Sequence, residues 1–350
     1  MSGEKRDVCL SSLSIPPKPM RAIIAIFFIA LAITSFSIPW VRRIAIDIGF
    51  VDAPAQRKLH STPMPLMGGV AIFGGAIVAV LLYYRGRPPE QVIGILLALT
   101  IVALIGLIDD RYSLPAWAKL GGQFAGFLIL AYFGVRVRLP IPDLLNYAIT
   151  FFWLAGISNA INFLDNMDGL SAGISAVAAA FMLLLGALNE QFLVSALAAA
   201  VLGACLGFLR YNFKPAQIFM GDVGALFLGF VLAILGLQLR FPENENVVTW
   251  MIPVMILGLP IFDTTLVVIS RLRRGVSPNT AGKDHSSHRL VKMGFSQREA
   301  VLILYLAAGA FGLVGIFLTR ATVLEGYLIG GVVVIAALYA IYRLEQVYRG

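Results

Sequence analysis

The sequence predicts an all-α fold, a polytopic membrane helix bundle with about eleven transmembrane helices. Hydrophobic residues make up 59% of the 350 residues and charged residues only 13%, whereas soluble domains average about 45–50% and about 25%. The mean hydropathy is +0.86. The apolar residues also gather into separate runs, and each run is long enough to cross a bilayer as a helix of roughly 17–25 residues.

The predicted spans follow one another along the chain with short polar links between them. They lie at about 21–41, 68–84, 91–108, 117–134, 145–161, 170–188, 192–210, 224–240, 247–269, 299–318 and 322–342. We therefore predict one transmembrane domain over 21–342, with tails at 1–20 and 343–350. Gly203 and Gly207 have the small-xxx-small spacing that favours close helix packing.

The distribution of basic residues predicts the orientation of the bundle. Eleven spans place the two termini on opposite sides, and Lys and Arg concentrate in cytoplasmic loops. The most basic loop, 270–298, is predicted to be cytosolic, which puts the N-terminus outside and the C-terminus in the cytoplasm. The net charge of +8 is explained by this topology, so we expect no nucleic-acid partner.

This orientation brings the polar side chains of the spans to one side of the membrane. The predicted cytosolic ends carry three histidines and six aspartates: His60, His285, His288, Asp109, Asp110, Asp165, Asp168, Asp222 and Asp263. Charged groups near membrane depth are costly and usually mark a functional site. A single Asp of this kind often does no more than end a helix. A group of aspartates and histidines from several separate loops instead favours one common site.

Two of these segments have the chemistry of a metal-dependent site. Asp109 and Asp110 are adjacent carboxylates at the end of an apolar run, where one pKa can be raised to suit a general base. In 159–170, Asn159, Asn162, Asp165 and Asp168 recur every third residue. Their oxygens suit a hard cation such as Mg²⁺, and no basic residue is near them in the sequence to neutralise the two Asp.

Three further segments suggest binding of a nucleotide-linked phosphate. Asp222 stands between glycines at the start of a helix, where phosphate can approach the backbone, and Phe219 offers a ring for stacking. His285, His288 and Arg289 favour anion binding more than zinc. Lys58 and His60 can bind an anion, although a positive-inside anchor explains this segment better when it is taken alone. There is no GxxxxGK[ST] loop, which disfavours an ATPase.

Together these motifs resemble the polyprenyl-phosphate N-acetylhexosamine-1-phosphate transferases, which include phospho-N-acetylmuramoyl-pentapeptide translocase. The resemblance covers nearly the whole chain and rests on the Asp-Asp pair, the 159–170 run and Phe-Met-Gly-Asp-x-Gly at 219–224. It implies a helix bundle in the bacterial inner membrane, with an active-site cleft facing the cytosol. It also implies transfer of a sugar 1-phosphate from a UDP-sugar to undecaprenyl phosphate, with release of UMP. The implied cofactor is Mg²⁺, with Mn²⁺ as a substitute.

The resemblance also implies roles for individual residues. Asp222 and Asn162 correspond to the metal site, and Asp109, Asp110 and Asp165 correspond to catalytic carboxylates. The implied substrate-binding residues are Asp168, Asn212, Phe219, Lys58, His60, His285, His288 and Arg289.

The runs at 260–264 and 285–290 are more similar to the N-acetylglucosamine-1-phosphate branch of the family. Two residues depart from the family pattern: Asn166 stands where Gly is usual, and Ser287 stands where this branch usually has another His.

Several alternatives stay open at this point. The donor can be UDP-N-acetylglucosamine, UDP-N-acetylmuramoyl-pentapeptide or another UDP-N-acetylhexosamine. The sequence does not distinguish direct attack by the lipid phosphate from a route through an aspartyl intermediate. It also leaves open whether the protein forms a homodimer. An ion-coupled transporter is the remote alternative. It is disfavoured because transporters place polar residues near the bilayer midplane and often show inverted repeats.

Overall fold

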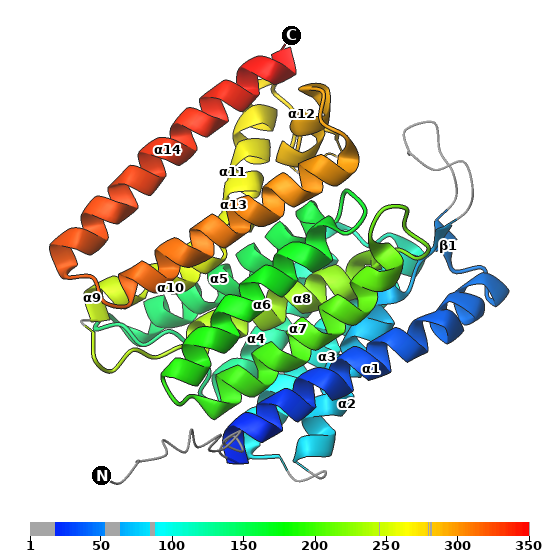
Figure 1. Ribbon diagram of the computed structural model, residues 1–350, viewed down its shortest axis with the longest axis horizontal. Helices are drawn as coiled ribbons and strands as arrows, with labels where there is room; N and C mark the ends of the chain where they lie inside the picture. Colours follow the sequence, from blue (N-terminus) through cyan, green and yellow to red (C-terminus); the bar gives the residue numbers. More distant parts are fainter. Residues whose placement is uncertain are drawn as a thin grey trace, which may run out of the picture.

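The computed structural model describes residues 18–52, 64–84, 88–244, 246–278, 280 and 282–349. Within these residues the chain is almost entirely helical (Figure 1), as predicted. Two short strands, β1 (Val51–Asp52) and β2 (Met64–Pro65), pair antiparallel. Lys58 and His60 belong to the segment between these strands and lie outside the described residues.

The helices follow the predicted spans closely. The first eight are α1 (Lys18–Asp47), α2 (Gly68–Tyr83), α3 (Glu90–Tyr112), α4 (Ala116–Tyr132), α5 (Asp143–Leu164), α6 (Leu170–Leu188), α7 (Phe192–Asn212) and α8 (Gly221–Gln238). The others are α9 (Asn246–Thr249), α10 (Met251–Ile256), α11 (Gly258–Arg273), α12 (Ser286–Lys292), α13 (Gln297–Leu318) and α14 (Val323–Arg349).

Eight of the described helices are long and apolar enough to cross a membrane, which confirms a polytopic membrane protein. Helices α2 and α4 match two more predicted spans but are shorter, with 16 and 17 residues. The predicted span 247–269 is not one continuous helix, because it is divided among α9, α10 and α11. Proline explains both breaks: Pro253 and Pro260 have no N–H to bond the carbonyls of Thr249 and Ile256.

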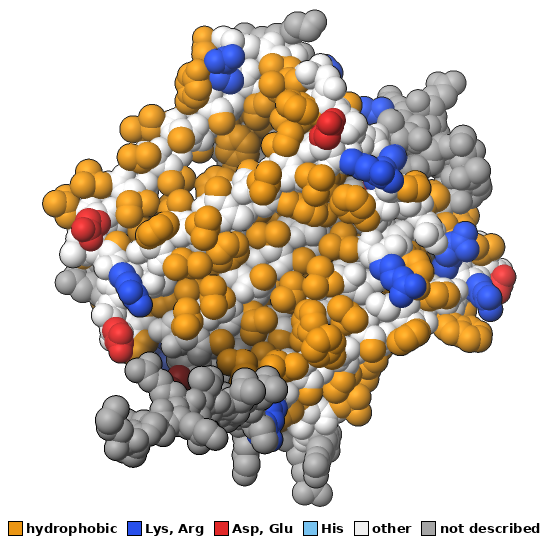
Figure 2. All heavy atoms as spheres, in the orientation of Figure 1, with side chains coloured by type: hydrophobic (Ala, Val, Ile, Leu, Met, Phe, Trp, Pro, Cys, Tyr) orange, Lys and Arg blue, Asp and Glu red, His pale blue; other side chains and the backbone are white. Residues whose placement is uncertain are grey.

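Helix α8 forms the centre of the bundle and α14 lies at its edge. In the most apolar stretch of α8, 89% of the residues are buried, whereas in the corresponding stretch of α14 only 17% are buried. Helix α8 packs against α3 and α5, whereas α14 lies diagonally outside α11 and α13 (Figure 1). The face seen in Figure 2 is mostly hydrophobic, with charged side chains near its borders. A lipid-facing surface requires this distribution because unpaired charges are costly in hydrocarbon.

Close packing of α1 on α7 confirms the interpretation of the small-xxx-small pair. A Cβ placed on Gly203 would collide with the carbonyl oxygen of Phe27, and one on Gly207 would lie 2.8 Å from the carbonyl oxygen of Leu31. Glycine at both positions therefore lets the two backbones touch, which is how small residues drive helix association in lipid.

Hydrogen bonds join the loops at each end of the bundle into two groups. At one end, the end of α3 bonds the start of α8, and the α5–α6 turn bonds both the α7–α8 loop and α12. At the other end, Gln191 of the α6–α7 link bonds Arg240, two residues after α8, and Asn244 bonds the end of α13. The first end collects the predicted polar segments, so the fold itself brings them together.

Candidate active site

The site is organised by Asp110, whose carboxylate holds the first turn of α8. Its Oδ1 accepts a hydrogen bond from the Asp222 backbone N–H at 2.7 Å, and its Oδ2 accepts from the Val223 N–H at 3.2 Å. A carboxylate at this place satisfies donors that the helix leaves unpaired and complements the positive end of the helix dipole. The structure thus shows a positioning contact for Asp110, and its predicted role as a base stays a prediction, because each carboxylate oxygen keeps a second lone pair.

Two glycines allow α3 and α8 to approach this closely. A Cβ on Gly106 would lie 2.5 Å from the Cα of Val223, and a Cβ on Gly221 would lie 2.5 Å from the Asp110 Oδ2. Gly221 also has a φ of +73°, a conformation that costs other residues roughly 1–2 kcal/mol. The glycines of both motifs are therefore required by the geometry of the carboxylates.

Lys119 joins the two remaining carboxylates at the centre of the site. Its ammonium forms an ion pair with Asp109 and a second one with the Asp222 Oδ2 at 2.7 Å. Asn162 donates its amide to the other Asp222 oxygen at 2.9 Å. The side chains of Lys119 and Asp222 are 23% and 27% exposed, so both can be reached by a ligand. Helices α3, α4, α5 and α8 thus meet at Asp222.

Asp165 extends this arrangement from the end of α5. It is half-buried at the C-cap of the helix. Burial, and then the charges of Asp222, Asp110 and Asp168, raise the pKa of Asp165 to about 8. A carboxyl group with this pKa holds its proton at pH 7 until a cation compensates the negative charge around it. We call Asp109, Asp110, Asp165 and Asp222 the acidic cluster.

The acidic cluster has the composition of a magnesium site that is completed by substrate. In the described part of the chain, no three His, Cys, Asp or Glu side chains are grouped so that they could hold a metal ion by themselves. Proteins commonly bind Mg²⁺ through only one or two carboxylates, with phosphate oxygens and waters as the other ligands. The residues fit this arrangement, since the four carboxylates lie near one cation, Lys119, whose ammonium pairs with Asp109 and Asp222.

The predicted nucleotide-binding residues connect the α5–α6 turn to the α7–α8 loop. Asp168 accepts a hydrogen bond from the Ala216 N–H at 3.0 Å and lies 3.5 Å from the Lys214 ammonium. The expectation that no basic residue would neutralise the Asp pair of 159–170 is therefore wrong for Asp168. Lys214 is distant in sequence, and only the fold brings it close.

Asn212 and Phe219 lie in the same region but differ in what they can offer a ligand. The Asn212 side chain is buried and bonded at both its oxygen and its nitrogen, because it accepts from the Gly169 N–H and donates to the Ile218 carbonyl, both at 2.9 Å. Phe219 is half-buried, and its backbone bonds Pro65 and Gly68. The structure thus makes Asn212 a support of the loop and leaves the Phe219 ring partly accessible.

The histidine loop docks on the same end of the bundle. The His285 Nδ1 lies 2.8 Å from an Asp263 oxygen, and Ser287 donates to the Asn166 amide oxygen at 2.6 Å. Burial, and then the charges of His285 and Lys283, lower the pKa of His288 to about 4. His288 is therefore neutral at pH 7, so it can bind a substrate by hydrogen bonding but cannot supply the positive charge that was expected.

Arg289 has a different position from the one predicted. Its side chain is 0% exposed, pairs with Glu345 at 2.7 Å and donates to the Leu344 carbonyl at 2.8 Å. It also donates to the Asp284 carbonyl at 2.8 Å. Arg289 therefore ties α12 to α14 inside the protein and is not presented to a substrate in this structure.

The loop before α12 is fixed by a second buried ion pair. Arg271 forms two hydrogen bonds with Asp284, at 2.8 and 2.9 Å, and Arg274 adds a third at 2.6 Å. Burial opposes ionisation of Asp284, but the two arginines outweigh it and hold its pKa at about 2. The loop residues that precede the histidines are thus fixed in place at neutral pH.

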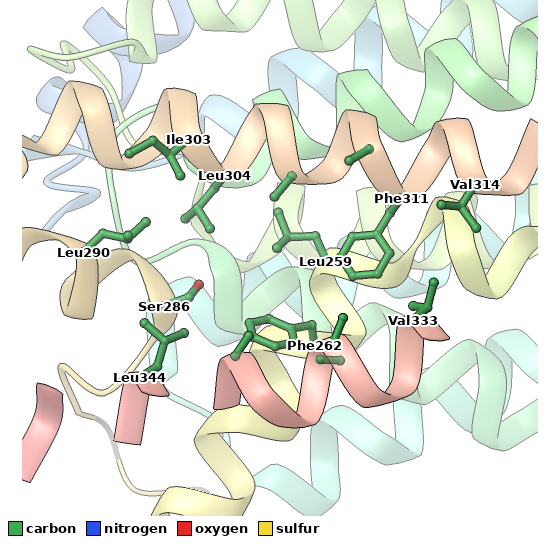
Figure 3. A pocket seen from close by; sticks show the side chains of 15 residues that line it. Leu259, Phe262, Ser286, Leu290, Ile303, Leu304, Phe311, Val314, Val333 and Leu344 are labelled. Atoms are coloured by element: carbon green, nitrogen blue, oxygen red, sulfur yellow. The ribbon is translucent and has the colours of Figure 1, made fainter. Parts of the chain in front are cut away.

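A cavity of about 420 Å³ lies between α11, α12, α13 and α14. Figure 3 shows its lining as almost entirely apolar side chains, with the Ser286 hydroxyl as an exception. Such a lining offers no charged group to a phosphate, so the phosphate chemistry belongs to the acidic cluster and not to this cavity.

Lys119 is the central residue that the sequence analysis did not single out. It lies near the start of the predicted span 117–134, among apolar residues and outside the motifs described above. The signal was present, because a lone cation inside an apolar run is rare and usually has a functional partner.

Comparisons with known proteins identify the family. The family model described as glycosyl transferase family 4 matches residues 92–240. A probable undecaprenyl-phosphate N-acetylglucosaminyl 1-phosphate transferase of Bacillus subtilis (strain 168) is 37% identical over 87% of each chain. A decaprenyl-phosphate N-acetylglucosaminephosphotransferase of Mycolicibacterium smegmatis is 34% identical, over 84% of this chain and 82% of its own. An undecaprenyl-phosphate alpha-N-acetylglucosaminyl 1-phosphate transferase of Escherichia coli (strain K12) is 26% identical over 81% and 80%.

Two of these relatives exceed 30% identity over more than four fifths of both chains. The family model covers the helices that carry the acidic cluster, from α3 to α8. The chain therefore belongs to glycosyl transferase family 4 and is a membrane-embedded polyprenyl-phosphate sugar-phosphate transferase.

Proposed function

We propose that this protein transfers N-acetylglucosamine 1-phosphate from UDP-N-acetylglucosamine to undecaprenyl phosphate, forming a lipid-diphosphate-linked sugar and UMP. The names of the relatives support this donor and a polyprenyl acceptor. The observation that carries the proposal is the junction of four helices at Asp222, where carboxylates, an amide and an ammonium converge. UDP-N-acetylmuramoyl-pentapeptide and other UDP-N-acetylhexosamines are the alternative donors.

The proposed reaction breaks one phosphoric anhydride bond and forms another. An oxygen of the lipid phosphate attacks the β-phosphorus of the UDP-sugar, and the bond from that phosphorus to the bridging oxygen of UMP breaks. Catalysis of such a transfer consists mainly of positioning and charge stabilisation. Bound Mg²⁺, held by Asp222 and Asn162, would neutralise the diphosphate; this role is a proposal that rests on the oxygen-rich donor set.

The remaining residues have proposed roles that follow from their contacts. Lys119 supplies a positive charge beside the reacting phosphates, because its ammonium already bridges Asp109 and Asp222. Asp110 keeps Asp222 at the start of α8. Asp165 releases or accepts a proton as the local charge changes, in keeping with its raised pKa. Asp168 and Phe219 are proposed to contact the uridine.

The proposed location is the bacterial inner membrane, with the acidic cluster facing the cytosol. Support comes from the loops that share one end of the bundle, including the basic segment 270–298. The transporter alternative loses its basis because the charged groups gather at helix ends and the relatives are transferases. A homodimer stays a prediction.

The test is release of UMP by purified protein from UDP-N-acetylglucosamine and undecaprenyl phosphate, with and without Mg²⁺. We expect UMP only when the acceptor and the metal are both present. A parallel assay with UDP-N-acetylmuramoyl-pentapeptide and UDP-N-acetylgalactosamine identifies the donor, and faster turnover of either would overturn the proposed sugar.

Exchange of labelled UMP into the UDP-sugar without any lipid acceptor would identify an aspartyl intermediate. Direct attack by the lipid phosphate permits no such exchange.

A further inference from the structure

Asp263 is a buried carboxylate outside the acidic cluster that makes three hydrogen bonds to the start of α12. It lies on α11 and is 0% exposed. One oxygen accepts from the Ser286 N–H at 2.7 Å and from the Ser286 hydroxyl at 2.6 Å. The other oxygen lies 2.8 Å from the His285 Nδ1. An ionised carboxylate can only accept hydrogen bonds, so the His285 Nδ1 must carry the proton.

His285 is held in this position from several sides. Its ring meets the Phe163 ring of α5 edge to face, with 6.3 Å between centroids, and the next-but-one residue, Ser287, bonds Asn166 in the α5–α6 turn. The first turn of α12 therefore bridges from Asp263 on α11 to the turn that also carries Asp165. With Nδ1 engaged by Asp263, Nε2 is the other ring nitrogen, in a side chain that is 7% exposed.

We infer that Asp263 is a positioning residue that binds the protonated Nδ1 of His285, so that Nε2 is the ring nitrogen that meets the sugar of the donor. An N-acetylhexosamine carries hydroxyl groups and an acetamide group that can hydrogen-bond a ring nitrogen. Carboxylates that orient a histidine through its other nitrogen act in this way in many sites. The inference rests on the proposed transferase function and on the substrate role that the family resemblance implies for His285.

The substitution Asp263→Asn tests the tautomer directly. The Asn amide oxygen can still accept from Ser286, but its NH₂ group then faces the His285 Nδ1 and moves the ring proton to Nε2. We expect kcat/KM for UDP-N-acetylglucosamine to fall about tenfold to a hundredfold, the usual loss when an orienting partner is removed. Ser286→Ala is the matched control: it removes one bond to Asp263 but keeps the contact between Asp263 and His285, so its loss of kcat/KM should be clearly smaller than that of Asp263→Asn.

A double-mutant cycle separates this role from a merely structural one. If Asp263 acts through His285, Asp263→Asn costs nothing further in a His285→Ala background. The inference would be overturned if the loss of kcat/KM in the double variant equalled the product of the two single losses, or if Asp263→Asn alone kept full activity. In both cases the substrate role of His285 would stand. Full activity of His285→Ala would instead remove the substrate role itself.

A measurement on the unaltered protein keeps the inference testable if Asp263→Asn does not fold. The chain has only three histidines, so nitrogen NMR of protein labelled with [¹⁵N]histidine can be assigned with His60→Ala and His288→Ala variants. We expect the His285 spectrum of a ring that is protonated at Nδ1. The opposite tautomer would overturn the inference.

Discussion

Replacing Asp110 by Asn tests whether this carboxylate positions Asp222 or acts as a base. The substitution keeps the size of the side chain but puts an NH₂ group against one of the two backbone donors, Asp222 N–H or Val223 N–H. One hydrogen bond to a charged acceptor is lost, worth about 1.5–3 kcal/mol, and the favourable interaction with the helix dipole adds about 0.5–1 kcal/mol. The substitution therefore removes about 2–4 kcal/mol of the interaction free energy that stabilises the first turn of α8.

If that whole loss appears in the transition state, kcat/KM falls about 30-fold to about 900-fold, since about 1.4 kcal/mol corresponds to a factor of ten. The assay is UMP release at saturating Mg²⁺, together with the thermal unfolding midpoint in detergent. Asp110→Asn should keep the shape of the pH–activity profile, because a positioning group does not exchange protons with the substrate.

Gly221→Ala provides an independent perturbation of the same contact. Its Cβ would lie 2.5 Å from the Asp110 Oδ2 and would push the carboxylate away without changing its chemistry. We expect a comparable loss, and a double variant no worse than the poorer single one. Disappearance of the limb of the pH profile that reports a general base, in Asp110→Asn but not in Gly221→Ala, would refute the reasoning.

Three further predictions concern the metal, the nucleotide and the topology. Asp222→Asn should abolish turnover in protein that still folds, and near-normal activity across a range of Mg²⁺ concentrations would remove the metal assignment. Phe219→Ala should raise KM for the UDP-sugar about tenfold or more with a smaller change in kcat, because stacking on a base is worth about 1–3 kcal/mol; an unchanged KM would make the ring a packing residue. A cysteine at Lys283, which is exposed, should react with impermeant thiol reagents only after cells are permeabilised, whereas one at Glu243, exposed at the other end, should react in intact cells. Labelling of both from outside would contradict the shared cytosolic face.

Much of the architecture could be predicted because it depends on composition along the chain. Apolar runs must form helices in lipid, where every backbone polar group has to be satisfied within the segment. The predicted span 247–269 is the exception, because hydropathy does not measure whether a residue can donate a backbone hydrogen bond. Pro253 and Pro260 are apolar enough to continue the run, but neither can donate a backbone hydrogen bond, so the helix breaks before each of them.

The sequence also identified the residues of the candidate site but not how they pair. Asn166 and Ser287 stood out only as two separate departures from the family pattern, yet in the fold they share a hydrogen bond of 2.6 Å. Lys119 was not predicted as a site residue because it lies in an apolar run, although its ammonium forms ion pairs with two of the carboxylates.

The sequence by itself thus determined that this protein is a membrane helix bundle with acidic chemistry at one end, because hydrophobic length and residue type are local properties. Only the tertiary structure decided that Asp110 bonds the first turn of α8, that Arg289 is buried in an ion pair and that Asp263 lies against His285. Each of these roles depends on which donor lies within about 3 Å of an oxygen, and such distances between segments far apart in the chain are set by how the helices pack.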